Sequence, residues 1–227
     1  EITYGDWSSD VCSSDLGDGA VGGVINIVTR SSSKQPPSAQ IESGYGSFRS
    51  QQGTVSANAS SGPFSGSVYG SAIGTDGYRV NNSLRQDVGT VDLRYNKDRD
   101  SAFLNIGVDD QRLRFPGART IDISSGVNEY ETDPRGTSTP LNYGNKQGLR
   151  VTGGYIRDLM NGIELILDGG VRQKNTQSGF FQAFGEAYVD SKTTTSSFTP
   201  RVNIRGNLFS WSNAVIAGID VYRTDYQ

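Results

Sequence analysis

The chain has 227 residues, with 21 Lys and Arg, 24 Asp and Glu and no His, which gives a formal net charge of −3. With a pI near 5.0 and no basic tract, nucleic-acid binding has no electrostatic support. The inventory of no histidine and one cysteine, Cys12, excludes a catalytic centre or a soft-metal site built on these residue types. No apolar run approaches the roughly 20 residues of a membrane-spanning helix, which excludes helical spans but not barrel strands.

Residues 6–16, DWSSDVCSSDL, have the period of neither a strand nor a helix and nearly repeat a Ser-Ser-Asp unit. Back-translated codon by codon, this segment looks like a short-read sequencing adapter. Our hypothesis is that it is a library artefact spliced into the gene, and we leave it out of the fold prediction. A natural surface loop rich in Ser and Asp is the alternative.

A glycine-rich segment, residues 17–23, runs directly into a β-branched strand, residues 24–29. Residues 17–22 match the pattern G-x-G-x-x-G of dinucleotide-binding proteins. That pattern binds a pyrophosphate only between a strand and a helix, whereas here the following residues favour a strand. We therefore interpret the glycines as structural, since they allow positive φ and close approach of the backbone to a neighbouring wall.

The run GDGAVGGVINIVTR, residues 17–30, resembles the end of the plug domain of TonB-dependent outer-membrane receptors, where a similar motif leads into the first barrel strand. The resemblance implies that residues 1–30 end a plug domain, that 31–38 form a linker and that 39–227 form the N-terminal portion of a β-barrel. It also implies a location in the bacterial outer membrane. The plug-motif residues are Gly17, Gly19, Gly22, Gly23 and Asn26.

The function implied by this resemblance is energised uptake of a scarce, large solute, such as an iron–siderophore or cobalamin complex. The implied partners of the full-length protein are the TonB complex of the inner membrane, outer-membrane lipid and a small-molecule metal chelate, with no nucleic acid. The chain begins within the motif and stops within a strand-like run. We therefore expect a fragment that does not transport on its own.

Strand-like runs with a period of two follow one another beyond the Pro36-Pro37 break. Apolar residues on one face and charged residues on the other indicate a different solvent at each face. We predict an all-β fold, an antiparallel meander that forms part of a larger transmembrane β-barrel. The nine predicted strands are roughly 39–46, 50–60, 64–74, 88–97, 101–114, 147–158, 163–175, 192–206 and 213–226.

The connections between these strands alternate in length, apart from a short first outer turn. Longer connections at 75–87, 115–146 and 176–191 are separated by short ones, as in outer-membrane barrels. A secreted β-sandwich adhesin would show the same residue alternation, with Val91, Leu93, Leu104 and Leu165 in a dry core. A porin-like channel would share the barrel but would not need residues 17–30. Both remain alternatives.

The candidate ligand-binding residues are arginines and aromatics in and beside the two longest predicted loops. Such side chains suit an anionic, ring-bearing ligand through charge-assisted hydrogen bonds and cation–π contacts. Packing of the loops against themselves is the alternative. The candidates are Arg114, Arg119, Tyr130, Arg135, Tyr143, Phe180, Phe181 and Phe184.

No arrangement of residues predicts catalysis, a cofactor or a metal site. We expect Asp92, Asp109, Glu164 and Asp168 to lie on the polar wall of the barrel rather than to form an acid/base pair. The acidic pairs near strand ends lack the D-x-[DN]-x-[DN]-G pattern of a calcium loop and are interpreted as solvated turn charges. The sequence therefore predicts a protein that is not an enzyme.

Overall fold

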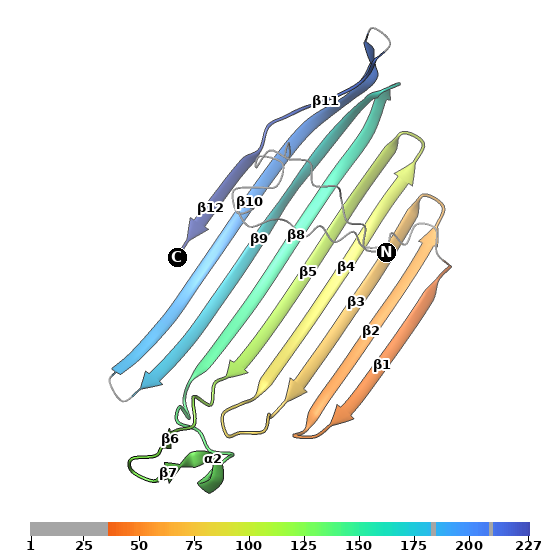
Figure 1. Ribbon diagram of the computed structural model, residues 1–227. Coiled ribbons are helices and arrows are strands. Elements are labelled where there is room, and N and C mark those ends of the chain that lie inside the picture. The colour runs from red at the N-terminus through yellow and green to blue at the C-terminus, as the bar shows by residue number, and fades with distance from the viewer. Residues whose placement is uncertain (1–35, 183–184, 209–210) are drawn as a thin grey trace. The chain divides into compact units, whose positions relative to one another are not determined.

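The computed structural model describes residues 36–182, 185–208 and 211–227. The chain divides into two units, Glu1–Ser31 and Ser32–Gln227, and the description below concerns the second. Its main element is a ten-stranded antiparallel sheet whose strands follow in chain order, with the last two strands both paired to the edge of the eighth (Figure 1). These strands are β1 (Ser38–Gly46), β2 (Ser50–Ser61), β3 (Phe64–Thr75), β4 (Leu84–Lys97), β5 (Asp100–Arg114), β8 (Tyr143–Met160), β9 (Ile163–Gln182), β10 (Gly185–Leu208), β11 (Trp211–Gly218) and β12 (Val221–Tyr226).

The count is ten strands rather than nine because the last predicted strand is interrupted. β11 and β12 pair with the same edge of β10 in one continuous register, with Arg201 opposite Gly218 and Phe198 opposite Val221. Pro200 lies between these pairs and has no N–H to donate to the ladder. The Ile219 N–H still donates to the Pro200 carbonyl at 3.0 Å. One missing donor therefore divides a strand that otherwise keeps its register.

The register gathers the apolar side chains on one face of the sheet, here called the apolar face. Val68, Val91, Ile106, Val151 and Val171 pair in succession across β3, β4, β5, β8 and β9. Among the described residues only one large apolar side chain is buried, and many on this face stay exposed, for example Val68 at 47%.

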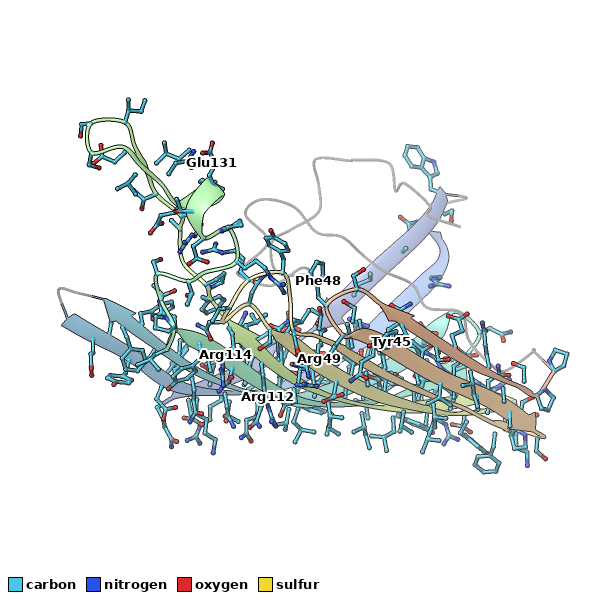
Figure 2. All side chains as sticks on the ribbon, turned by 90° about the horizontal axis from the view of Figure 1, so that it is seen from below. Tyr45, Phe48, Arg49, Arg112, Arg114 and Glu131 are labelled. Atoms are coloured by element: carbon cyan, nitrogen blue, oxygen red, sulfur yellow. The ribbon has the colours of Figure 1, made fainter. Side chains whose placement is uncertain are left out.

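The sandwich alternative is wrong for the described part of the chain. No second sheet packs on the apolar face there, and Figure 2 shows side chains extending from both sides of a single layer. Leu93 is 50% exposed and Leu104 38% exposed, although the sandwich would place both in a dry core. The antiparallel meander predicted from the sequence is confirmed.

The opposite side of the sheet, here called the polar face, carries the carboxylates that the sequence placed on a polar wall. Asp92 pairs with Arg94 at 2.7 Å, and Asp168 pairs with Arg201 at 3.0 Å. Glu164 accepts a hydrogen bond of 2.9 Å from an asparagine amide. Neighbouring side chains of the same face therefore bind the carboxylates of Asp92, Asp168 and Glu164.

The two ends of the sheet differ. At one end, the turn end, two-residue turns at 62–63, 98–99 and 161–162 join neighbouring strands. Gly62 and Gly162 adopt φ of 57° and 82° in two of these turns, a conformation that glycine adopts without steric cost. At the other end, the loop end, the connections at 76–83 and 115–142 are longer, whereas the first, at 47–49, is short as predicted. The predicted difference between short and long connections is confirmed at these positions.

One predicted loop, residues 176–191, is wrong. β9 and β10 continue as a paired hairpin through this segment, with Thr176 opposite Ser191 and Phe181 opposite Glu186. The alternation is lost here because Thr176, Gln177 and Ser178 are polar on both faces, and Phe180 and Phe181 are apolar on both faces. Phe180 and Phe181 therefore lie on β9 and not in a loop.

Candidate functional site

The long connection between β5 and β8, residues 115–142, is here called the arm. It contains a two-stranded sheet of β6 (Ile121–Asp122) and β7 (Val127–Asn128), followed by the short helix α2 (Glu129–Thr132). The Asn128 side chain caps α2 by accepting a hydrogen bond of 3.2 Å from the Tyr130 N–H. Figure 2 shows the arm, with Glu131 on α2, rising from the sheet on the side away from Arg112. In the described residues no helix is long and apolar enough to cross a membrane.

Arg79, in the connection at 76–83, holds the base of the arm. Its guanidinium donates to the carbonyls of Gly117 at 2.7 Å, Gly136 at 3.0 Å and Pro116 at 3.1 Å. These three carbonyls come from the two sides of the arm. The planar five-donor fork of arginine can serve several acceptors at once, so one side chain joins the outgoing and returning segments.

Asn81 makes a second set of contacts with the arm. Its amide nitrogen lies 3.0, 2.7 and 3.0 Å from the carbonyls of Phe115, Thr139 and Asn142. Asn81 has a φ of 57°, a conformation that asparagine tolerates better than most residues. Neither Arg79 nor Asn81 was among the residues predicted from the sequence. The available signal was that the connections at 76–83 and 115–142 leave the same end of adjacent hairpins.

Two of the predicted ligand-binding arginines have partners within the loops. Arg119 is 6% exposed at its side chain and forms ion pairs with Asp133 at 3.0 Å and Glu129 at 3.7 Å. Arg135 donates to the Tyr78 carbonyl at 3.1 Å, and its guanidinium lies over the Tyr78 ring at 5.6 Å. Both contacts support the arm, as the alternative of loop self-packing predicted.

Arg114 and Tyr143 are opposite one another at the loop ends of β5 and β8, and the guanidinium lies 5.4 Å from the centre of the ring. By register they share the side of the sheet that carries Ile106 and Val108. They lie beyond the band of apolar residues on that side, so the pair faces outward rather than towards the polar face.

The two phenylalanines of β9 point to opposite sides. Phe180 lies on the polar face and stacks on Phe115, with ring centres 6.1 Å apart and planes 7° apart. Phe181 lies on the other side and meets Tyr188 edge to face at 5.4 Å. The described candidates are therefore divided between the two sides of the sheet and the arm, and they do not form one pocket.

Tyr130 is the most exposed of the aromatic candidates that the structure describes. It is 58% exposed on α2, and Ile123, in the same arm, is 93% exposed. Phe184 and the plug-motif residues Gly17, Gly19, Gly22, Gly23 and Asn26 lie outside the described residues. Within the described ranges, no three His, Cys, Asp or Glu side chains gather as metal ligands.

Four cations on the polar face were also missed. Lys146 and Arg150 lie on β8, and Arg172 and Lys174 lie on β9. The signal was present in the sequence, because residues separated by an even number on one strand share a face. The register between β8 and β9 was not predicted from the sequence. This register brings the two cations of β8 next to the two cations of β9.

Asp122 supports the tip of the arm through its carboxylate. It accepts hydrogen bonds from the Ser124 side chain at 2.6 Å, the Ser124 N–H at 2.9 Å and the Ser125 side chain at 2.5 Å. The Ser124 and Ser125 hydrogen bonds lower the pKa of Asp122 from 3.8 to about 2. Since they favour the charged form, their support of the turn is present above pH 3.8 and is lost as the pH falls through about 2.

We expect a titration of the Asp122 carboxyl carbon by NMR, with the chain in detergent micelles, to show a midpoint near 2. Changing both Ser124 and Ser125 to alanine removes the side-chain donors and moves the midpoint up towards 3.8. The Asp122→Asn variant identifies the resonance by its loss. A midpoint of 3.8 in the unchanged chain would contradict the described turn.

No protein-family model and no curated protein matches the chain. Among solved structures, the ferric citrate transporter FecA in its unliganded form matches 83% of this chain and 28% of its own, at 13% identity and a TM-score of 0.66. A chain of the FpvAI–pyocin S2 complex matches 87% of this chain at 10% identity, with a TM-score of 0.68. P. aeruginosa FpvA bound to a heterologous pyoverdine with iron matches 85% at 12% identity, with a TM-score of 0.65.

This chain spans 28% of the length of each of these structures. FecA and FpvA are TonB-dependent receptors of the bacterial outer membrane. At identities of 10–13% the likeness concerns the fold. The described sheet therefore has the fold of part of the β-barrel of a TonB-dependent receptor, in agreement with the resemblance of residues 17–30.

Proposed function

We propose that the chain is part of a TonB-dependent receptor of the outer membrane, which takes up an iron–siderophore-like or cobalamin-like ligand. In this proposal residues 1–30 end the plug, residues 31–38 form the linker and residues 39–227 form the first part of the barrel. The partners are the TonB complex, outer-membrane lipid and a small metal chelate. The three matched structures are FecA, a ferric citrate transporter, and FpvA in pyocin-bound and pyoverdine-bound forms, which supports a chelate as the ligand.

The observation that carries the proposal is a single-layer sheet with one exposed apolar face. A soluble protein would bury such a surface, because apolar area exposed to water is costly. Lipid at the apolar face and water at the polar face satisfy both sides of every strand. The short turns at one end and the longer connections at the other fit the periplasmic and extracellular ends of a barrel.

The predicted ligand-binding residues have different roles in this proposal. Tyr130 is exposed on the arm and offers an aromatic contact to a solute. Arg119 and Arg135 act indirectly, because their guanidinium groups hold the arm in shape. Arg114, Tyr143 and Phe181 lie on the outward side, so we infer that they contact the membrane surface or neighbouring loops.

The membrane part of the proposal is tested by extraction from a Gram-negative host that expresses the chain. We expect the chain to stay with the membranes through alkaline carbonate and high salt, and to be released by detergent, because its apolar face is solvated only by lipid or detergent. Release by carbonate, or recovery in the soluble fraction without detergent, would contradict a barrel segment.

The transport part of the proposal is tested with the whole receptor in living cells. We expect these cells to take up a radioactive ferric chelate, and we expect the uptake to stop when a protonophore removes the proton gradient.

A further inference from the structure

A cluster of four cations lies on the polar face, in the loop-end half of β8 and in the middle of β9. Arg150 is directly opposite Arg172, and Lys174 is opposite Gly148, two residues away on β8. Lys146 follows on the same face of β8. These four residues are here called the cationic cluster. They contribute four positive charges to a small area of the wall.

The cationic cluster has few partners among the described residues. None of its four side chains forms an ion pair there, and their one side-chain hydrogen bond among the described residues runs from Arg150 to the Asn105 side chain at 3.4 Å. Some other charges on the polar face do form ion pairs, as Asp168 does with Arg201 at 3.0 Å. Like charges directly opposite one another destabilise a sheet, so the pair Arg150 and Arg172 carries a cost that an anion would offset.

The surface beside the cationic cluster is hollowed. A depression of about 340 Å³ is lined by all four cations, by Asp109 and by Gly107 and Gly148, among others. A Cβ added at Gly148 would collide with the Asp109 carboxylate, and one added at Gly107 would lie 3.7 Å from Arg150 Nη2. The Asp109 carboxylate therefore occupies the space over Gly148, and the absence of a side chain at Gly107 leaves the surface beside the Arg150 guanidinium open. Asp109 is the one carboxylate among the lining residues.

We propose that the cationic cluster binds the carboxylate or phosphate groups of a small polyanionic solute. The inference rests on the proposed function, because the polar face is then the wall of the transport lumen, and it narrows the transported ligand to a polyanionic chelate. Arginine presents a planar fork that binds carboxylate and phosphate with two hydrogen bonds, and lysine adds a point charge. Four cations against one carboxylate leave the net charge of the hollow at +3, counted from its lining residues.

The test uses the whole chain in detergent micelles, with its β content confirmed by circular dichroism, and isothermal titration calorimetry with citrate and with pyrophosphate. We expect at least one of these probes to bind, and acetate, with a single charge, to bind at least tenfold more weakly. Arg150→Gln with Arg172→Gln should weaken binding at least tenfold. The matched control is Arg85→Gln with Arg112→Gln, another pair of directly opposed arginines on the other side of the sheet, each near an aspartate.

The control variant should bind the probe as the unchanged chain does. Citrate binding without pyrophosphate binding assigns a carboxylate ligand, and the reverse assigns a phosphate ligand. Failure of both probes to bind the folded chain, or an equal loss in both double variants, would overturn the inference. These results are separable from the proposed function, because a chain that needs detergent for extraction but binds neither probe retains the receptor fold and loses only this site.

Discussion

Replacing Val68 with arginine is expected to destabilise the membrane-inserted sheet by about 2–4 kcal/mol, the cost of an arginine on the lipid face of a barrel at the bilayer midplane. Val68 lies in the middle of the apolar residues of β3 and pairs with Ala57 and Val91 on the same face. It is 47% exposed, so the substitution meets the surrounding solvent rather than a packed core. The measurement is a urea titration of the chain in lipid vesicles, followed by the fluorescence of its tryptophans.

The neighbouring residue provides the control for this prediction. Ser67 lies on the polar face, opposite Asp92 and Asn58, so an arginine placed there meets water and a carboxylate. Ser67→Arg should therefore change stability by about 0.5 kcal/mol or less, as is usual for surface substitutions. If both variants lose the same stability in vesicles, the assignment of the apolar face to lipid is wrong. If only Val68→Arg loses stability, the alternation of apolar and polar residues along the strand reflects lipid on one face of the sheet and water on the other.

The strands of the sheet were predictable because the residues of most strands alternate between apolar and polar, and this alternation can be recognised in each strand by itself. In β5, the alternation of Ala102, Leu104, Ile106 and Val108 with polar or small residues needs no knowledge of the partner strands. The same reasoning failed where the alternation is absent. Between 176 and 191 polar and aromatic residues fall on both faces of the hairpin, so the residues that pair there resemble those of a loop.

The interruption of the last strand was predictable in principle but was not predicted. Its cause, Pro200, lies on β10, while its effect appears at Ile219 and Asp220 on the partner strand. A proline on an otherwise regular strand removes one donor from whichever edge its nitrogen faces. Identifying the affected residue requires the register, which depends on the lengths of the turns between the strands.

The candidate site was less predictable than the fold, because its geometry depends on contacts between distant segments. The sequence shows that the arm is rich in arginine and aromatic residues, but not that Arg119 faces Asp133 and Glu129. Nor does it show that Phe180 and Phe181, adjacent in sequence, fall on opposite sides once they lie on a strand. Residue type selected the candidates, and strand parity and tertiary contacts decide which of them a solute can reach.

Replacing Arg79 with alanine is expected to release the arm from the connection at 76–83. The substitution removes three hydrogen bonds from a charged donor to the carbonyls of Pro116, Gly117 and Gly136. Each such bond contributes about 1.5–3 kcal/mol when buried, and Arg79 is only half-buried, so we expect a loss of about 2–4 kcal/mol in the local opening free energy. Hydrogen exchange measured by mass spectrometry should then be at least about 30-fold faster in the arm.

Two further variants separate the loss of this contact from the loss of an arginine. Arg79→Lys keeps the charge, but a single ammonium cannot serve three carbonyls as the guanidinium does, so the exchange rate should be intermediate. Arg99→Ala removes an arginine at the turn end whose side chain makes no hydrogen bond or ion pair among the described residues, and it should leave the arm unchanged. Because Arg79 contacts the arm and not the apolar face, detergent extraction and β content should be the same in all three variants. Equal exchange in the arm of Arg79→Ala and the unchanged chain would show that Asn81 and the Arg119 ion pairs hold the arm without it.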